Sequence, residues 1–127
     1  MSLDEGSVGK TNFIEDHGLW SQEMKALSLD IIKQVEMKGL QTVRVAWGDQ
    51  HGIVRGKNVM VKDFIQSLKN GIDFQTATLF FDTTNNMFAP MFEPDAGIGM
   101  PELAGGPDAL LVPDPNTFKI LPWAEKT

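Results

Sequence analysis

The spacing of apolar residues changes from a helical period to a strand period and back again before Gly71. From Trp20 onward, apolar residues recur in steps of three and four, which places them on one face of a helix: Met24, Leu27, Ile31 and Val35. Ser21 is the predicted N-cap, and Gly39 is the predicted left-handed residue after the helix. Residues 42–47 then alternate between apolar and polar side chains, which predicts a half-buried strand.

A second strand and a second helix follow directly. Residues 48–52 have the composition of a turn and residues 53–59 resume an extended pattern, so the two strands are predicted to form a hairpin. Helical spacing returns in the next segment, and Asn70-Gly71 is a strong stop signal. The apolar residues that carry this spacing are Val61, Phe64, Ile65 and Leu68.

The remainder of the chain predicts short strands around one long irregular segment. Residues 74–81 are β-branched and aromatic, and residues 109–112 and 118–121 are short apolar runs, so each is predicted to be a strand. Residues 82–107 are rich in Gly and Pro and show no sustained period, which is typical of a functional loop or of a disordered segment. The predicted fold class is α+β, a mixed sheet with helices packed on one face.

Composition excludes several classes of function. The 127 residues carry a net charge of −6, with eleven Lys and Arg in total, so nucleic-acid binding is not expected. The absence of cysteine excludes a disulfide scaffold and any thiolate zinc site, and it suggests a cytoplasmic location. The chain has no run long enough for a membrane span and no secretory signal pattern. Residues 1–19 are expected to form a flexible arm, in which Met1 to Leu3 resemble residues added during cloning.

Asp82 is the first candidate functional residue because it follows an apolar strand and opens the long loop. The alternative is structural: Asp82 starts an Asx-turn with Thr83 and Thr84. Arg55 and Lys57 could meet a phosphate or carboxylate, although a solvated hairpin face is the favoured interpretation.

The remaining candidates favour structural roles. Asp49 and Gly52 fit a type I turn. His17 and His51 fall in predicted loops, and metal binding by this chain alone is not expected. Apolar side chains within the irregular loop either fold back onto the core or meet a partner, and these are Met87, Phe88, Met91, Phe92 and Met100.

Three motifs resemble the amino-terminal, β-grasp-like domain of the glutamine synthetase family, over residues 20–127. Residues 106–118, running on to Leu121-Pro122-Trp123, resemble the family's Asp-Met-x-Leu-x-Pro-Asp-x-x-Thr segment. Asp49, Gly52 and Arg55-Gly56-Lys57 are similar to its Asp-x-x-Gly hairpin and the basic strand after it. Phe81-Asp82-Thr83-Thr84 stands where the family has Phe-Asp-Gly-Ser-Ser.

The resemblance implies an ATP-dependent glutamate–ammonia ligase. In this family ATP phosphorylates the γ-carboxylate of glutamate, and an amine then displaces the phosphate with the help of Mg²⁺ or Mn²⁺. By position Asp82 takes the role of binding and deprotonating ammonium, with Thr84 and Asn85 as secondary amine-site residues. The nucleotide and metal sites belong to a carboxyl-terminal catalytic domain that is expected to follow Thr127, with no such site in this chain. The chain alone is therefore expected to be inactive.

The resemblance also implies partners and leaves alternatives open. Each active site of the family lies between the amino-terminal domain of one subunit and the catalytic domain of its neighbour in a homo-oligomeric ring. Thr83 replaces the family's usual glycine, and residues 85–105 are unlike the usual loop. A γ-glutamyl ligase acting on a larger amine or a polyamine is therefore an alternative. A free-standing, non-catalytic binding or assembly module is another.

Overall fold

The computed structural model describes residues 12–127 as an α+β fold with two main helices and two small sheets. Each sheet has two antiparallel strands, one formed by β1 and β2 and the other by β3 and β4. The predicted α+β class is confirmed, although two separate two-stranded sheets replace the single mixed sheet that was predicted. In this part of the chain, no helix has the length and apolar character needed to cross a bilayer.

The helix α2 (Gln22–Met37) begins and ends at the residues that the sequence predicts. The side chain of Ser21 accepts a hydrogen bond from Met24 N–H, which satisfies one free donor of the first turn. At the other end Gly39 has φ 60° and donates to Glu36 O, while Leu40 N–H donates to Val35 O. These two bonds form a Schellman motif, which fixes the exit direction of the chain toward β1.

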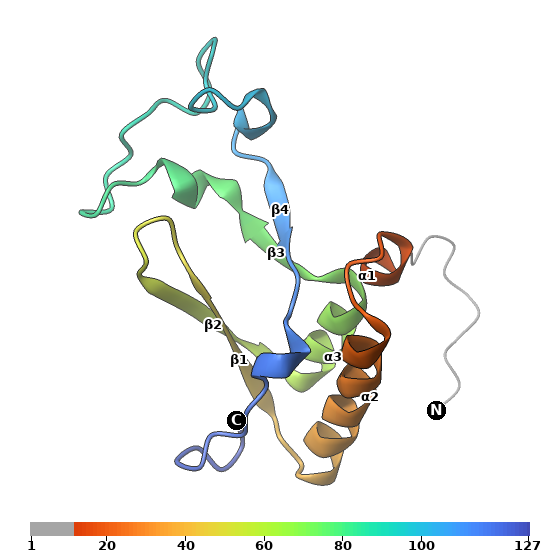
Figure 1. Ribbon diagram of the computed structural model, residues 1–127. Helices are drawn as coiled ribbons and strands as arrows, with labels where there is room; N and C mark the ends of the chain where they lie inside the picture. The colour runs from red at the N-terminus through yellow and green to blue at the C-terminus, as the bar shows by residue number, and fades with distance from the viewer. Residues whose placement is uncertain (1–11) are drawn as a thin grey trace.

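The hairpin also forms as predicted. Strands β1 (Thr42–Gly48) and β2 (Val54–Met60) pair in a register that sets Val43 opposite Val59 and Trp47 opposite Arg55. Helix α3 (Val61–Asn70) starts at once after β2 and ends at Gly71, where φ is 74°. Figure 1 shows α2 and α3 beside the base of this hairpin, while the hairpin tip points toward the start of the long loop.

The predicted strand over residues 74–81 is wrong beyond its first residues. Strand β3 (Ile72–Gln75) pairs with β4 (Asp108–Leu111), and the chain then turns into the 3₁₀-helix η1 (Thr76–Phe80). Three residues per turn place Ala77 and Phe80 on the same side, and both are buried in one cluster. In a strand, residues three apart would point to opposite faces.

The predicted strand over residues 118–121 is not formed. Instead, the segment leaves the 3₁₀-helix η3 (Pro115–Thr117) as irregular chain. Phe118 stacks on Phe64 of α3, with ring centroids 6.4 Å apart, so its side chain still reaches the core. Pro122 directly follows the segment, and proline lacks the N–H group that would continue a strand ladder past residue 121.

The expected flexible arm is partly ordered. Residues 1–11 lie outside the described residues, but α1 (Phe13–Asp16) is a short helix, and its Ile14 is only 1% exposed. Ile14 belongs to the main hydrophobic cluster together with Trp20, Ile31, Val35, Leu40, Val43, Phe64 and Leu68. The ordered domain therefore starts before residue 20, because burial of Ile14 ties α1 to the core.

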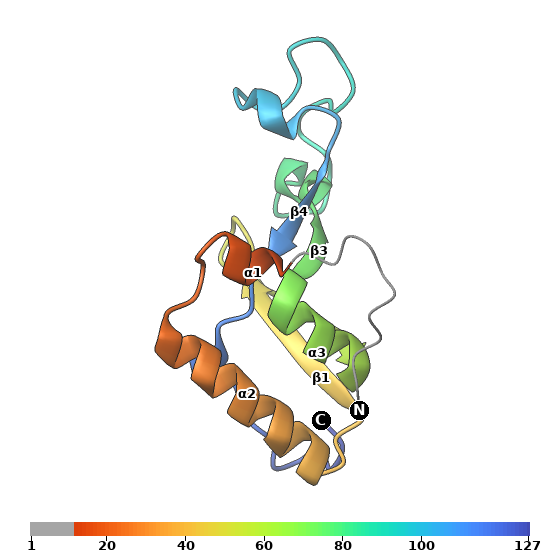
Figure 2. The same cartoon turned by 90° about the vertical axis from the view of Figure 1, so that its right-hand side faces the viewer.

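A second, smaller cluster lies at the base of the long loop. It contains Ala77, Phe80 and Met91, with Leu79, Ala89 and Leu103 packed around them. Figures 1 and 2 show β3, β4 and the loop extending away from α2 and α3. The short 3₁₀-helix η2 (Pro101–Leu103) is the one helical turn within residues 82–107. The predicted irregular loop is thus confirmed, and its base has a core of its own.

Candidate functional site

The tip of the β1–β2 hairpin is organised by the carboxylate of Asp49. Its Oδ1 accepts hydrogen bonds from His51 N–H at 2.8 Å and Ile53 N–H at 2.9 Å, while Oδ2 accepts from Arg55 Nε at 3.0 Å. Gly52 N–H donates to Asp49 O at 3.0 Å, which closes the turn that the sequence predicts. The Asp49 side chain is only 9% exposed. The tip is therefore held together by hydrogen bonds from a single carboxylate.

Opposing effects act on the pKa of the Asp49 carboxyl. Burial raises this pKa, because it disfavours the charged form. The hydrogen bonds from Ile53, Arg55 and His51, together with the positive charge of Arg55, lower it and outweigh burial. The pKa of Asp49 therefore lies below its ordinary value of 3.8, and the side chain is a carboxylate at neutral pH.

Asp82 forms a second turn at the start of the long loop. Its Oδ1 accepts from Thr84 N–H at 2.8 Å, from the Thr84 hydroxyl at 2.7 Å and from Asn86 N–H at 3.0 Å. Its own N–H donates to Asn86 O at 2.8 Å, and Asn85 N–H donates to Asp82 O at 3.0 Å. The Asx-turn interpretation is thus confirmed at the level of local structure.

The turn leaves Oδ2 of Asp82 without a donor among the residues that the structure describes. Within residues 12–127, all hydrogen bonds to the Asp82 carboxylate end on Oδ1. The Thr84 hydroxyl, followed by Asn86 N–H, is the main cause that holds the pKa of Asp82 below 3.8, despite the opposing effect of burial. Thr84 N–H and His51 lower this pKa further. Oδ2 therefore belongs to an ionised, half-buried carboxylate that can accept additional N–H donors.

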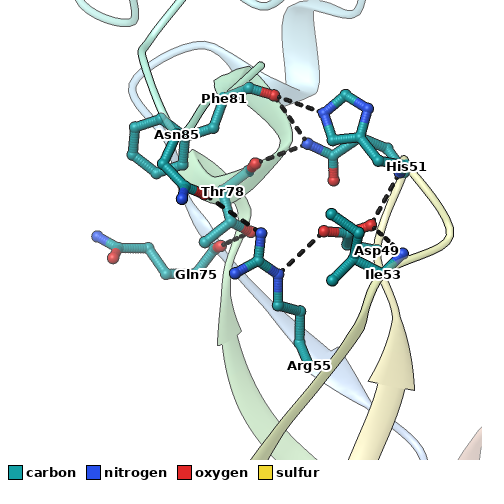
Figure 3. Close-up of polar contacts among 9 residues, drawn as sticks. Asp49, His51, Ile53, Arg55, Gln75, Thr78, Phe81 and Asn85 are labelled. Carbon is teal, nitrogen blue, oxygen red and sulfur yellow. Dashed lines mark hydrogen bonds and ion pairs between the residues drawn. The ribbon is translucent and has the colours of Figure 1, made fainter. Parts of the chain in front are cut away.

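The hairpin tip lies against Phe81 and Asn85, which come before and after Asp82, although sequence spacing gives no sign of this (Figure 3). Gln50 Nε2 donates to Thr78 O at 2.9 Å and to Phe81 O at 3.2 Å. His51 Nε2 lies 3.0 Å from the same Phe81 oxygen. Since Nε2 faces a carbonyl, it is the protonated nitrogen of this imidazole. Gln50 is a functional candidate that the sequence does not point to, and His51, considered above only as a metal ligand, is a second.

Arg55 links the same two segments on the other side. It reaches Asp49 through Nε and Asn85 through an Nη2–Oδ1 contact of 3.3 Å. Lys57 does not join this group, because its Nζ donates to Asp73 O at 2.8 Å. Arg55 and Lys57 therefore each have a protein acceptor, and the two do not form a shared anion site.

The other sequence candidates lie apart from this site. His17 contacts Phe13 O within α1 through Nδ1, at 2.9 Å. No group of three His, Asp or Glu side chains within residues 12–127 is placed to hold a metal ion. In the apolar loop, Met91 is buried in the second cluster, whereas Phe88 is 56% exposed and Phe92 is 83% exposed. Of the five apolar candidates of the loop, Met91 thus folds back onto the second cluster, whereas Phe88, Phe92, Met87 and Met100 are exposed to solvent.

Comparison with known proteins identifies relatives over most of the chain. A γ-glutamylanilide synthase of an Acinetobacter species is 32% identical over 121 residues, which is 93% of this chain and 24% of that protein. A type-1 glutamine synthetase 2 of Dictyostelium discoideum is 25% identical over 80% of this chain and 19% of its own length. A glutamate–isopropylamine ligase of a Pseudomonas species is 26% identical over 84% of this chain and 22% of its own length.

These relatives are members of the glutamine synthetase family, so the resemblance predicted from the sequence motifs is confirmed. The chain matches the amino-terminal part of these proteins and spans a quarter of their length or less. No protein-family model matches the chain.

Proposed function

We propose that this chain is the amino-terminal domain of an ATP-dependent γ-glutamyl ligase, and that Asp82 binds the acceptor amine. The observation that supports the proposal is that the two oxygens of the Asp82 carboxylate have different surroundings. Oδ1 is held by three hydrogen bonds from Thr84 and Asn86, and these leave Oδ2 for a ligand. The relatives support the ligase class, since all three carry names of enzymes of this family.

The chemistry follows from the charge and direction of this side chain. An ionised carboxylate attracts an ammonium group and accepts its N–H donors. An ammonium group must lose a proton before its nitrogen attacks an acyl phosphate, and a neutral amine loses one as the amide forms and phosphate leaves; in both cases a nearby carboxylate is a suitable acceptor for the proton. Thr84 acts through Asp82, because its hydroxyl donates to Oδ1. Asn85 would border the amine at the next position of the turn.

The acceptor that we favour is an amine larger than ammonia. Two of the three relatives are named for such amines, aniline and isopropylamine, and the aniline enzyme has the higher identity of 32%. Thr83 supports this choice, since it departs from the family's glycine next to Asp82. Ammonia remains the second candidate, supported by the Dictyostelium glutamine synthetase.

ATP and a divalent cation would be held outside this chain. In the part of the chain that the structure describes, no cluster of three or more His, Asp or Glu side chains is placed to hold a metal ion. We assign both to a catalytic domain that forms the active site together with this one. The exposed rings of Phe88 and Phe92 lie in the same loop as Asp82, and burying them against that domain, or against a neighbouring subunit, would be favourable.

Steady-state kinetics of the full-length protein test the proposal. Phosphate release would be measured with ATP, Mg²⁺ and glutamate while ammonium, isopropylamine and aniline are varied, for the wild type and for Asp82→Asn. The amide oxygen of asparagine can still accept the hydrogen bonds of the turn, so the substitution removes mainly the charge. Asp95→Asn is the matched control, because Asp95 is an exposed carboxylate of the same loop.

We expect Asp82→Asn to lower kcat/KM for the preferred amine by about 100-fold, as is typical for loss of an acid–base group, and Asp95→Asn to leave it unchanged. Equal kcat/KM values for the two variants would remove Asp82 from the amine site. Absence of turnover with every amine would instead support a non-catalytic module.

A further inference from the structure

The peptide group between Phe81 and Asp82 is contacted by side chains of the β1–β2 hairpin. The carbonyl oxygen of Phe81 lies 3.2 Å from Gln50 Nε2 and 3.0 Å from His51 Nε2, so two side chains of the hairpin tip converge on a single acceptor. Gln50 also donates to Thr78 O at 2.9 Å. One glutamine therefore fixes both the end of η1 and the start of the Asp82 turn.

The far side of the same turn is held by the same hairpin. Asn85 has a left-handed backbone, with φ 62°, a conformation in which asparagine is common. Its side-chain oxygen meets Arg55 Nη2 at 3.3 Å. Contacts from the hairpin therefore bracket Asp82 in sequence, one at the residue before it and one three residues after it.

The hairpin tip that makes these contacts is itself held together by a network of hydrogen bonds. Asp49 binds two backbone N–H groups of the tip and the guanidinium of Arg55, all between 2.8 and 3.0 Å. No side chain of the tip forms a hydrogen bond with the Asp82 carboxylate in the described part of the chain. The tip can therefore influence Asp82 by fixing its backbone, and through that the direction of Oδ2.

We propose that Gln50 and Arg55 are positioning residues for the amine site, holding the Asp82 turn in the orientation that receives the amine. This inference rests on the proposed function. A hydrogen bond contributes modestly to stability, but a misplacement of about 1 Å at a reacting group can cost far more in rate. Loss of either contact should therefore affect steps that involve the amine, and leave the use of ATP and glutamate unaffected.

Matched pairs of variants in the full-length protein test this inference. Gln50→Met keeps the length of the side chain but removes its donors. Its control is Gln41→Met, since Gln41 is exposed and its side chain forms no hydrogen bond within residues 12–127. Arg55→Lys keeps the charge but removes the planar fork. Its control is Arg44→Lys, because Arg44 makes an equivalent contact with Asn58, at 3.3 Å, on the same hairpin.

Two readouts are expected to move together. We expect kcat/KM for the amine to fall about two- to tenfold in Gln50→Met and Arg55→Lys, while KM for ATP and for glutamate stays within error of the controls. Hydrogen exchange of the backbone amides of residues 82–86, followed by mass spectrometry, should be faster in the same two variants.

The outcomes separate the two proposals. If Asp82→Asn impairs use of the amine but both positioning variants behave like their controls, the positioning inference is wrong and the proposed function stands. Equal losses for amine, ATP and glutamate would mean general unfolding and would also overturn the inference. If Asp82→Asn has no effect on the amine, the proposed function is wrong and the inference is wrong with it.

Discussion

The side-chain oxygen of Asn85 lies 3.3 Å from Nη2 of Arg55, so a residue of the long loop is bonded to a strand 30 positions earlier in the chain. Arg55 in turn donates a hydrogen bond to Asp49 at the hairpin tip. This path of hydrogen bonds joins the hairpin turn at Asp49 to the turn at Asp82. Substitutions in the hairpin are therefore expected to alter the conformation of the loop at Asn85.

Asp49→Asn should destabilise the domain. An asparagine presents one acceptor oxygen in place of two and lacks the charge that attracts Arg55, so at least one of the three hydrogen bonds is lost. We expect a lower urea midpoint at pH 7 and faster exchange of the amides of His51 and Ile53. Asp73→Asn, an exposed position on β3, is the control and should match the wild type. Equal midpoints for the two variants would contradict the assignment.

The effect of Asp49→Asn should depend on pH with a defined sign. The pKa of Asp49 is lower in the folded state than the ordinary 3.8, so the folded state favours the charged form. Its contribution to stability is therefore complete above about pH 5 and is lost as the pH falls through 3.8 toward the lower folded-state pKa. We expect the difference in unfolding free energy between wild type and variant to be constant from pH 6 to 8 and to shrink below pH 4. A difference that grew with acidity would contradict the sign.

Ile31→Ala should cost about 2–5 kcal/mol of unfolding free energy, because it opens a cavity in the main cluster. Leu29→Ala, in the same helix, is the control. Ile31 is 1% exposed and Leu29 is 62% exposed, so the control should change stability by less than about 0.5 kcal/mol. Urea unfolding followed by circular dichroism measures both variants. Similar losses at both positions would mean that the packed face of α2 is assigned incorrectly.

Gly71→Ala should destabilise the domain more than Gly39→Ala. Both glycines have a positive φ, 74° at Gly71 and 60° at Gly39, so an added Cβ strains the backbone at each position. Only at Gly71 would the new Cβ also meet a neighbour, the backbone oxygen of Leu111 at 2.9 Å, whereas the space at Gly39 is open. Thermal unfolding of the two variants gives the order. A lower Tm for Gly39→Ala would contradict the close approach of β4 to Gly71.

The elements that the sequence predicts well are those whose signals are local. Ser21 and Gly39 mark the ends of α2 by their own hydrogen bonds and backbone angles, and Asp49 and Asp82 fold their turns with residues two to four positions away. Each such pattern can be recognised within a few residues, because the donors and acceptors that form the hydrogen bonds are neighbours in the chain.

The features that the sequence does not predict depend on distant partners. Residues 76–80 have a composition suited to a strand, but the shared burial of Ala77 and Phe80 with Met91 decides for a 3₁₀-helix. The contacts of Gln50 with Thr78 and Phe81 span 28 and 31 positions, and a glutamine in a polar turn gives no local sign of them. The positioning contacts of the candidate site are therefore a product of tertiary structure.

Phe80→Ala should open the base of the loop while the main domain stays folded. Phe80 is fully buried, but its cluster with Ala77 and Met91 is separate from the cluster that holds α2, α3 and β1 together. Its loss removes most of the apolar burial that fixes the start of the loop, at a cost of about 3–5 kcal/mol where the surroundings do not relax. The amides of residues 81–88 should then exchange faster, while those of α2 keep their protection.

The matched control for Phe80→Ala is Phe92→Ala in the same segment, since Phe92 is 83% exposed and its removal should leave exchange unchanged. If the two clusters are independent, only the loop should exchange faster. If they formed a single cooperative core, α2 would lose its protection from exchange together with the loop. Because Phe81 O is the acceptor for Gln50 and His51, a loop released by Phe80→Ala should also lose these contacts. Faster exchange confined to the loop, with slower use of the amine by the full-length protein, would tie the small cluster to the orientation of Asp82.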